Sequence, residues 1–218
     1  VETLFYPVNW FDSLECIENR DSKKTEEKIK LTLSGIGLGG NTHNNLVVRA
    51  YKLLDEKYNL PPVKAHLHKA IPMGAGLGGG SADAAFFIKL LNTKLELGLA
   101  WGEMHHYAKQ LGSDCSFFIS NKPAFVKGKG DDFEGISLNL ENYYLALIYP
   151  NIHINTANAY SGVKPKKPNQ SIENIIQLPI TEWKNKLHND FEDSIFIDHP
   201  EIRAIKEKLY VHGALYAS

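Results

Sequence analysis

The chain has 218 residues, 43% of them hydrophobic and 22% charged, which argues against wholesale disorder and fibrous repeats. Twenty-four Lys and Arg against 25 Asp and Glu give a formal net charge of −1. This balance argues against a nucleic-acid partner but leaves room for one local anion site. Two cysteines, Cys16 and Cys115, are too few for a secreted disulfide scaffold, so we expect a reducing compartment, the cytoplasm.

The longest apolar run extends from Tyr143 to Tyr149 and is far shorter than the roughly twenty residues that a helix needs to cross a bilayer. No charged start followed by an apolar stretch opens the chain, so no secretory signal is visible. We therefore expect no membrane partner. The length fits one large domain or two small ones, and a composition shift near residues 137–142 is the best candidate for a boundary.

The first part of the chain predicts short strands joined by polar loops. Strand-like apolar residues lie between positions 5 and 17 and are interrupted at Pro7 and at Asp12–Ser13. The highly charged residues 18–28 indicate a solvated loop or hairpin. Residues 29–33 then alternate between apolar and polar side chains, as a half-buried strand does.

A loop rich in Gly and Asn at residues 35–45 leads to the first predicted helix, 45–59. Apolar residues recur there at helical spacing, and Pro61–Pro62 prevents continuation. Residues 63–68 alternate again, which predicts a strand with one solvent-exposed face that runs into a cluster of glycines.

The next helix is expected to begin at Ser81 as its N-cap, and a shorter one over residues 103–111 is expected to end at Gly112. Gly112 would take the left-handed conformation that often follows a helix. The remaining predicted elements are, in chain order, strand 124–126, loop 128–135, strand 143–149, exposed linker 164–168, and helices 183–196 and 200–210.

The stretch PMGAGLGGGS, Pro72 to Ser81, is the most informative part of the sequence. Its five glycines allow positive φ and let a ligand approach the main chain, so that successive N–H groups can converge on an anion. A helix that begins directly after them adds unpaired N–H groups and the positive end of its dipole. Strand, glycine loop and helix together predict a phosphate site, with a flexible turn as the simpler alternative.

The motif does not fit the P-loop, because no lysine stands between Gly80 and Ser81. Gly74, Gly76 and Gly79 match the dinucleotide-binding fingerprint, but the preceding strand should then be almost wholly apolar. Histidines interrupt it instead. A nicotinamide-dependent oxidoreductase therefore stays an alternative of low rank.

The run KAIPMGAGLGGGSADAA, residues 69–85, resembles the second motif of the GHMP kinases, the superfamily of galactokinase, homoserine kinase and mevalonate kinases. Four flanking stretches follow the family in the same order: ETLF (2–5), NNLVVRA (44–50), LGSDCSFF (111–118) and NDFE (189–192). These flanks resemble the branch that phosphorylates a cytidine diphosphate-linked methylerythritol. The similarity covers essentially the whole chain.

The resemblance implies an α+β, two-domain GHMP kinase fold. Residues 1–138 would be the ATP-binding N-terminal domain, similar to domain 2 of ribosomal protein S5, and residues 139–218 the start of an α/β sandwich domain. The implied reaction is ATP-dependent phosphorylation of the 2-hydroxyl of the substrate in non-mevalonate isoprenoid precursor synthesis, with Mg²⁺ accompanying ATP. We expect a small-molecule substrate and a monomer or homodimer.

The resemblance also assigns the residues that contact ATP. Ser81 would lie beside the β- and γ-phosphates, and Lys69 would approach the phosphates, although on its own it could be a solvated lysine. Asn45 would lie near the nucleotide, although it could also simply cap the helix it opens. The predicted nucleotide loop comprises Pro72, Met73, Gly74, Ala75, Gly76, Leu77, Gly78, Gly79, Gly80, Ser81 and Ala82.

Asp114 matches the catalytic aspartate of the family. Phosphoryl transfer needs a group that orients and deprotonates the attacking hydroxyl, and a carboxylate in the tight turn after Gly112 suits that task. Taken without the resemblance, an aspartate in such a turn is more often an Asx-turn residue.

Asn155, Thr156 and Tyr160 align with family positions that hold the cytidine end of the substrate. An aromatic ring there could stack on the pyrimidine, which can contribute about 1–3 kcal/mol per base. The alternative is an amphipathic helix that buries Tyr160.

No metal site is predicted. His66 and His68 share a strand face and His105 and His106 are adjacent, but no acid or cysteine pattern completes a ligand set, so surface roles are favoured. Cys115 is expected to be an inert buried thiol.

Two family features fall outside the chain: a lysine-bearing opening strand, which would precede Val1, and a second glycine-rich loop, which would begin near Gly213. We therefore expect the chain to be part of a longer kinase. A kinase for another small alcohol is one alternative, and a non-catalytic nucleotide-binding module is another if the lysine is truly missing.

Overall fold

The computed structural model describes residues 1–20, 27–36, 42–166, 168 and 170–218. It divides into two compact units, Val1–Ile136 and Ser137–Ser218. The unit boundary therefore lies between residues 136 and 137, close to the expected boundary after residue 138. Parts of the predicted loops 18–28 and 35–45, and of the linker 164–168, lie outside the described residues.

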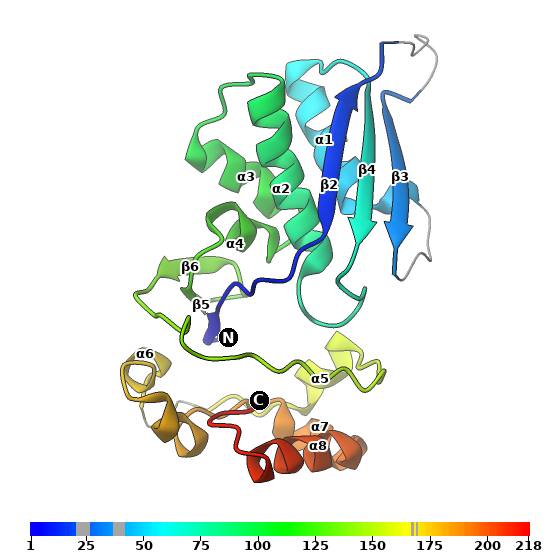
Figure 1. The fold of residues 1–218 in the computed structure, drawn as a ribbon. Coiled ribbons are helices and arrows are strands. Elements are labelled where there is room, and N and C mark those ends of the chain that lie inside the picture. Colours follow the sequence, from blue (N-terminus) through cyan, green and yellow to red (C-terminus); the bar gives the residue numbers. More distant parts are fainter. Residues whose placement is uncertain (21–26, 37–41, 167, 169) are drawn as a thin grey trace. The chain divides into compact units, whose positions relative to one another are not determined.

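The first unit contains six strands and four α-helices among its described residues (Figure 1). In chain order these are β1 (Thr3–Phe5), β2 (Ser13–Glu18), β3 (Ile29–Gly35), the 3₁₀ turn η1 (Thr42–Asn44), α1 (Leu46–Tyr58), β4 (Val63–Lys69), α2 (Gly79–Lys94), α3 (Trp101–Leu111), α4 (Cys115–Ser120), β5 (Ala124–Lys127) and β6 (Asp132–Gly135).

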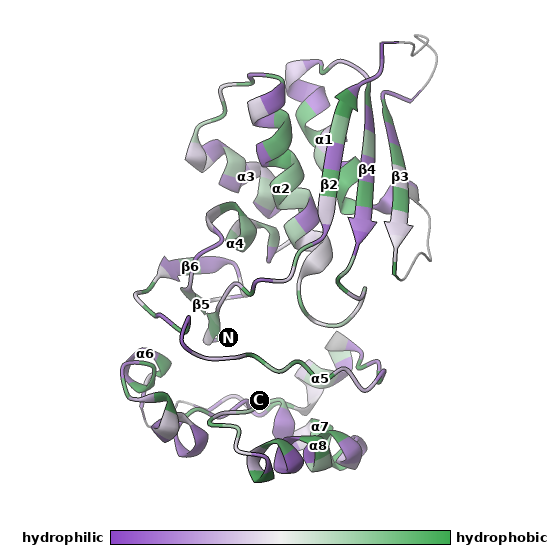
Figure 2. Cartoon of the chain, in the orientation of Figure 1, coloured by the Kyte–Doolittle hydropathy of each residue, from purple (hydrophilic) through white to green (hydrophobic). Residues whose placement is uncertain are grey.

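The larger sheet has the order β2–β4–β3, with β4 antiparallel to β2 and parallel to β3. The predicted alternation along β4 is confirmed, because Val63, Ala65 and Leu67 are buried while the residues between them are not (Figure 2). His66 and His68 lie on the other face, where both hydrogen-bond with the Ser34 hydroxyl, at 2.9 and 2.8 Å. These contacts agree with the expected surface role.

Helices α1 and α2 pack against each other and against the buried face of this sheet (Figure 1). The predicted helix at 45–59 is confirmed as α1. Asn45 caps it, since its Oδ1 accepts from the N–H of Val47 at 2.9 Å, and Asn59 ends it in the left-handed conformation. The core between the layers includes the fully buried rings of Tyr51 and Phe87.

One predicted helix start and one predicted glycine conformation are wrong. Helix α2 begins at Gly79, not at Ser81, because Gly78 occupies the N-cap position at φ +67° and already turns the chain into the helix. Helix α3 does end before Gly112, but this glycine has φ 174° and is extended, not left-handed. The chain continues instead into a tight turn in which the N–H of Cys115 donates to the Gly112 carbonyl at 3.2 Å.

The smaller sheet has the order β1–β5–β6, antiparallel throughout. The predicted strand at 124–126 is confirmed as β5, whereas β6 lies in a segment that was expected to be a loop. Phe133 pairs with Val126 there. Phe5 of β1 packs edge-to-face on Phe117 of α4, with 5.2 Å between ring centroids, which joins the sheet to the helices.

The second unit is helical over the residues that the structure describes. Its elements are α5 (Thr156–Gly162), α6 (Ile172–Ile175), the 3₁₀ helix η2 (Ile180–Asn185), α7 (Glu192–Asp198) and α8 (Pro200–Val211). Helix α8 confirms the prediction for 200–210, with Pro200 in its first turn. Trp183 anchors the unit: it is buried, its Nε1 donates to the Leu178 carbonyl at 3.0 Å, and Tyr216 packs against its ring.

Two predictions for this unit are wrong. Residues Tyr143 to Tyr149 form no strand, because no other segment among the described residues of the unit offers them a hydrogen-bonding edge, and Tyr144 is fully exposed. The helix expected at 183–196 is interrupted between η2 and α7. Asn189 accepts the N–H of Phe191 at 3.1 Å in this gap, a local bond that competes with helix continuation. No helix in the described part of the chain is long and apolar enough to cross a membrane.

Candidate active site

The glycine loop connects β4 to α2 in the first unit. Gly74, Gly76 and Gly78 have φ of +75°, +73° and +67°. Every second residue of this part of the loop therefore has the positive φ that was predicted from its glycines. A side chain at Gly74 or Gly76 would meet no atom within 4 Å. The main chain is therefore open to a ligand at these two positions.

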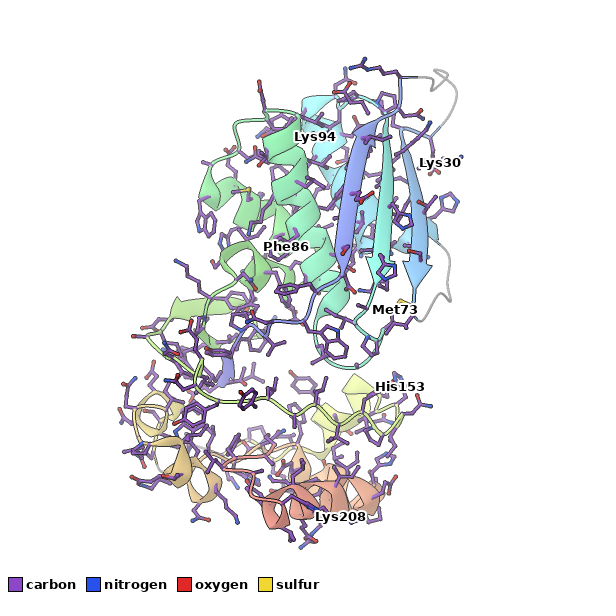
Figure 3. All side chains as sticks on the ribbon, in the orientation of Figure 1. Lys30, Met73, Phe86, Lys94, His153 and Lys208 are labelled. Carbon is purple, nitrogen blue, oxygen red and sulfur yellow. The ribbon has the colours of Figure 1, made fainter. Side chains whose placement is uncertain are left out.

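The loop leads directly into a helix of sixteen residues whose first N–H groups have no partner within the helix. Gly79 and Gly80 belong to the first turn of α2 and so extend the row of bare main chain into the positive end of the helix dipole. Met73, labelled in Figure 3, lies on the loop and is half exposed. This arrangement has the donors and the field that an anionic phosphate group requires.

A cavity of about 710 Å³ in the first unit lies beside the loop. Gly76, Leu77, Gly78, Gly79 and Ala82 of the predicted nucleotide loop line it. The other predicted members, Asn45, Lys69, Pro72–Ala75, Gly80 and Ser81, do not contribute to its lining.

The rest of the cavity wall is mostly apolar and aromatic. It comes from the segment before β2 and from α2 and α4, so residues far apart in the sequence meet around one cavity. Its aromatic members are Phe5, Tyr6, Trp10, Phe11, Phe86, Phe117 and Phe118. Such a wall lowers the local dielectric and strengthens electrostatic interactions inside the cavity.

Asp114, the predicted catalytic residue, also lines this cavity. It is half-buried in the turn between α3 and α4, and its carboxylate makes no capping bond to α4. Its neighbour Ser113 donates to Oδ1 at 3.1 Å. The structure therefore brings the predicted base and the glycine loop to one site, although 32 residues separate Asp114 from Ala82 in the chain.

Lys69 is not a solvated lysine. Its side chain is 5% exposed, and Nζ donates to Asp83 at 2.8 Å and, in a shorter bond, to Asp12. Asp12 also accepts the N–H groups of Ala70 and Ile71, at 2.6 and 2.9 Å. The three charged residues form one buried cluster at the junction between β4 and the loop.

Sequence reasoning missed Asp12 and Asp83. The pair Asp12–Ser13 was interpreted only as an interruption between strands, because the partner of Asp12 lies 57 residues further along the chain. A buried lysine at the inward end of an alternating strand was the available signal. It required acidic partners, since burial of an unpaired charge is very unfavourable.

The cluster changes the pKa values of its members. Burial raises the pKa of Asp83 to about 6, although the hydrogen bond from Lys69 lowers it. Burial acts in the same direction on Asp12, but there the bonds from Lys69, Ile71 and Ala70 prevail and the pKa is lowered. The pKa of Lys69 is raised, because its two carboxylate partners outweigh its burial.

Two other predicted residues, Asn45 and Ser81, do not line the cavity. Asn45 is the N-cap of α1, so the capping role is the one its contacts describe. Ser81 lies in the first turn of α2, and its side chain lowers the pKa of Cys115. Burial of this thiol is confirmed and raises its pKa, the larger of the two effects, while its inertness stays a prediction.

The predicted substrate residues belong to the second unit. Asn155 caps α5 by accepting the N–H groups of Ala157 and Asn158, at 2.9 and 3.3 Å. Tyr160 is half exposed and packs edge-to-face on Phe191, with 5.0 Å between centroids, so it is not buried by an amphipathic helix. Thr156 opens α5, and its side chain lies outside the described part. Their role in substrate binding stays a prediction.

The acidic residues, histidines and cysteines can also be compared with the ligand sets of metal sites. Among the described residues, no group of three or more His, Cys, Asp or Glu side chains is arranged to hold a metal ion.

The loop, the helix that follows it and the match to a family sequence model define the class of protein. The model for the N-terminal domain of GHMP kinases matches residues 45–129, which include the loop and Asp114. A solved homoserine kinase from Cytophaga hutchinsonii shares the fold, with a TM-score of 0.69 over 96% of this chain and 73% of that one, at 14% identity. The expected α+β GHMP kinase fold is thus confirmed.

Closer relatives narrow the class. The 4-diphosphocytidyl-2-C-methyl-D-erythritol kinase of Bacteroides fragilis is 48% identical over the whole chain and 78% of its own length. A solved 4-(cytidine 5′-diphospho)-2C-methyl-D-erythritol kinase is 26% identical, with a TM-score of 0.76 over 97% of this chain and 74% of that one. The chain belongs to the 4-diphosphocytidyl-2-C-methyl-D-erythritol kinase family. It is therefore an ATP-dependent small-molecule kinase, not an oxidoreductase.

Proposed function

We propose that the protein transfers the γ-phosphoryl group of ATP to the 2-hydroxyl of 4-diphosphocytidyl-2-C-methyl-D-erythritol, a step of non-mevalonate isoprenoid precursor synthesis. The acceptor is the one named for the relatives. The observation that carries the proposal is the cavity that Asp114 and Gly76–Gly79 line together. A cytoplasmic location and a monomeric or homodimeric state stay predictions.

In this proposal the glycine loop holds the triphosphate. The open main chain at Gly74 and Gly76 and the first turn of α2 would direct N–H groups and the helix dipole at the phosphate oxygens. Mg²⁺ enters as part of the nucleotide substrate and neutralises charge on the phosphates. The apolar wall would exclude water that could otherwise accept the phosphoryl group.

Asp114 acts as the base. The acceptor oxygen forms a bond to the γ-phosphorus while the bond from that phosphorus to the β,γ-bridging oxygen breaks, and ADP leaves. The hydroxyl proton passes to the carboxylate of Asp114. Asp114 makes no capping bond to α4, and the hydrogen bond from Ser113 is to Oδ1, so Oδ2 would be available for this transfer.

The test replaces Asp114→Asn in the full-length protein. We expect kcat to fall by about 10²–10⁴, the usual contribution of a positioned general base, while binding of a non-hydrolysable ATP analogue changes by less than about twofold. Asp131→Asn is the matched control, because Asp131 pairs with Lys109 at 2.9 Å and does not line the cavity.

Two results would count against the proposal. If Asp114→Asn retained kcat, Asp114 would not be the base. If phosphate transfer across a panel of small alcohols favoured another acceptor over the cytidine diphosphate-linked methylerythritol, the protein would be a GHMP kinase of different specificity.

A further inference from the structure

The cluster of Asp12, Lys69 and Asp83, here called the acidic triad, has more charge than its structural role requires. With both carboxylates ionised it carries two negative charges and one positive charge. Its side chains are 4%, 5% and 7% exposed, so water screens this excess little. One carboxylate would have sufficed to neutralise the lysine.

The acidic triad lies against the nucleotide loop. A Cβ placed on Gly79 would stand 3.4 Å from the Lys69 Nζ, and Asp12 and Asp83 line the same cavity as Gly76–Gly79. Phosphates bound at the loop, as the proposed function requires, would thus meet a negatively charged cluster whose single ammonium is already shared by two carboxylates.

The charges around Asp83 can be named. Lys69 of β4 and Asp12 of the segment before β2 act on it directly. Within the described residues, the other charged groups of the cavity lining are Lys89 of α2 and Asp114 ahead of α4. Lys89 is already engaged: its Nζ donates to the Ile119 carbonyl at 3.1 Å and lies over the ring of Phe86. Lys69, whose Nζ would lie 3.4 Å from a Cβ on Gly79, is therefore a cation beside the loop.

The two carboxylates are held differently. Asp12 accepts two main-chain N–H groups in addition to Lys69, which stabilises its ionised form. Within the part of the chain that the structure describes, Asp83 is held by the Lys69 ammonium alone, and its burial disfavours the ionised form. When negative phosphates approach, Asp83 is the member of the acidic triad that most readily becomes neutral.

We propose that Asp83 is a positioning residue of the nucleotide site, which takes up a proton when the triphosphate binds and thereby leaves the Lys69 ammonium to the phosphates. The proton comes from solvent, no covalent bond to a heavy atom changes, and the Lys69–Asp12 pair is kept. This inference rests on the proposed function, since it assumes that the loop binds ATP.

The test is calorimetric titration of the full-length protein with a non-hydrolysable ATP analogue at pH 7, in two buffers of different ionisation enthalpy. Mg²⁺ is saturating, so that the nucleotide is already ionised before it binds. The wild-type protein should take up on the order of half a proton or more per nucleotide bound. Asp83→Asn, which keeps an acceptor for Lys69 but cannot ionise, should lose this uptake.

Kinetics give a second readout that a merely structural role would not move. Between pH 6 and pH 8 the KM for ATP of the wild-type protein should rise by up to about tenfold as Asp83 ionises, and Asp83→Asn should flatten this rise while kcat stays within about threefold. Asp55→Asn is the control. Asp55 forms an ion pair of 2.8 Å with Lys28 and does not line the cavity. The Asp55→Asn variant should therefore keep the proton uptake and the pH profile of KM of the wild-type protein.

Equal proton uptake in the wild-type protein and in Asp83→Asn would overturn the inference. If the variant failed to fold, the wild-type protein alone would decide, and a proton uptake of zero would overturn the inference. In either case nucleotide binding itself would leave the proposed function standing. Failure of the wild-type protein to bind the analogue would instead refute the proposed function.

Discussion

The two units of the chain differ in how far their apolar residues are buried. In the first unit, Tyr51, Phe87 and Phe125 are all less than 2% exposed, and sheet and helices share a continuous core. In the second unit, α8 buries none of its residues, and Tyr144 and Ile197 are 105% and 79% exposed. An apolar pattern therefore defines a stable element only where another layer is present to cover it.

The strongest way to test this comparison is to truncate a large apolar side chain to alanine in each unit. Phe87→Ala leaves a cavity between α2 and its neighbours and should lower the free energy of unfolding by about 3–5 kcal/mol. Ile197→Ala, at an exposed position of α7, should change it by less than about 0.5 kcal/mol. Urea denaturation followed by circular dichroism measures both. Similar losses in the two variants would contradict the comparison.

A second prediction concerns the backbone contact between β3 and β4. A Cβ at Gly35 would lie 2.0 Å from the Lys69 carbonyl oxygen, and Gly35 has φ +94°. Gly35→Ala should therefore cost at least about 3 kcal/mol, because main-chain atoms must move in addition to the backbone strain. Gly130→Ala is the matched control: φ is +85° but the space is open, so strain alone should cost about 1 kcal/mol. Thermal unfolding of both would show whether the close contact matters.

The smallest expected change in stability comes from removing either of two helix N-caps of the same residue type. Asn45→Ala removes the cap of α1, a thirteen-residue helix packed on the core, and should cost about 1 kcal/mol. Asn155→Ala removes the same bond from α5, a seven-residue helix with an exposed surface, and should cost less than about 0.5 kcal/mol, because that helix contributes little to global stability. Chemical denaturation of both variants provides the measurement; a larger loss for Asn155→Ala would show that the second unit is more cooperative than its burial suggests.

The same contrast explains what the sequence could predict. Helix α1, strand β4 and helix α8 were predicted closely, because periodicity, a cap or a proline marks each of them within a few residues. The N-cap of α2 was placed three residues late, since Ser81 is a good N-cap by composition but the left-handed Gly78 takes that position first. The strand expected at Tyr143 to Tyr149 failed because a strand needs a partner that local sequence does not reveal.

At the candidate site, the glycine loop was predictable from its glycines, and Asp114 only from the resemblance to a family. The acidic triad was not predicted, because its bonds join Asp12 to Lys69 and Lys69 to Asp83 across three elements. Such long-range pairs follow from the sheet register, which sets the end of β4 beside the start of β2. Only the folded chain shows them.

Both thiols of the chain, Cys16 on β2 and Cys115 at the start of α4, are buried in the first unit, and burial raises the pKa of each. An alkylating reagent can therefore modify them only when that unit opens. Labelling rates would report the opening free energy of residues 1–136, the unit that contains both cysteines. The two cysteines are thus natural reporters of opening in the first unit.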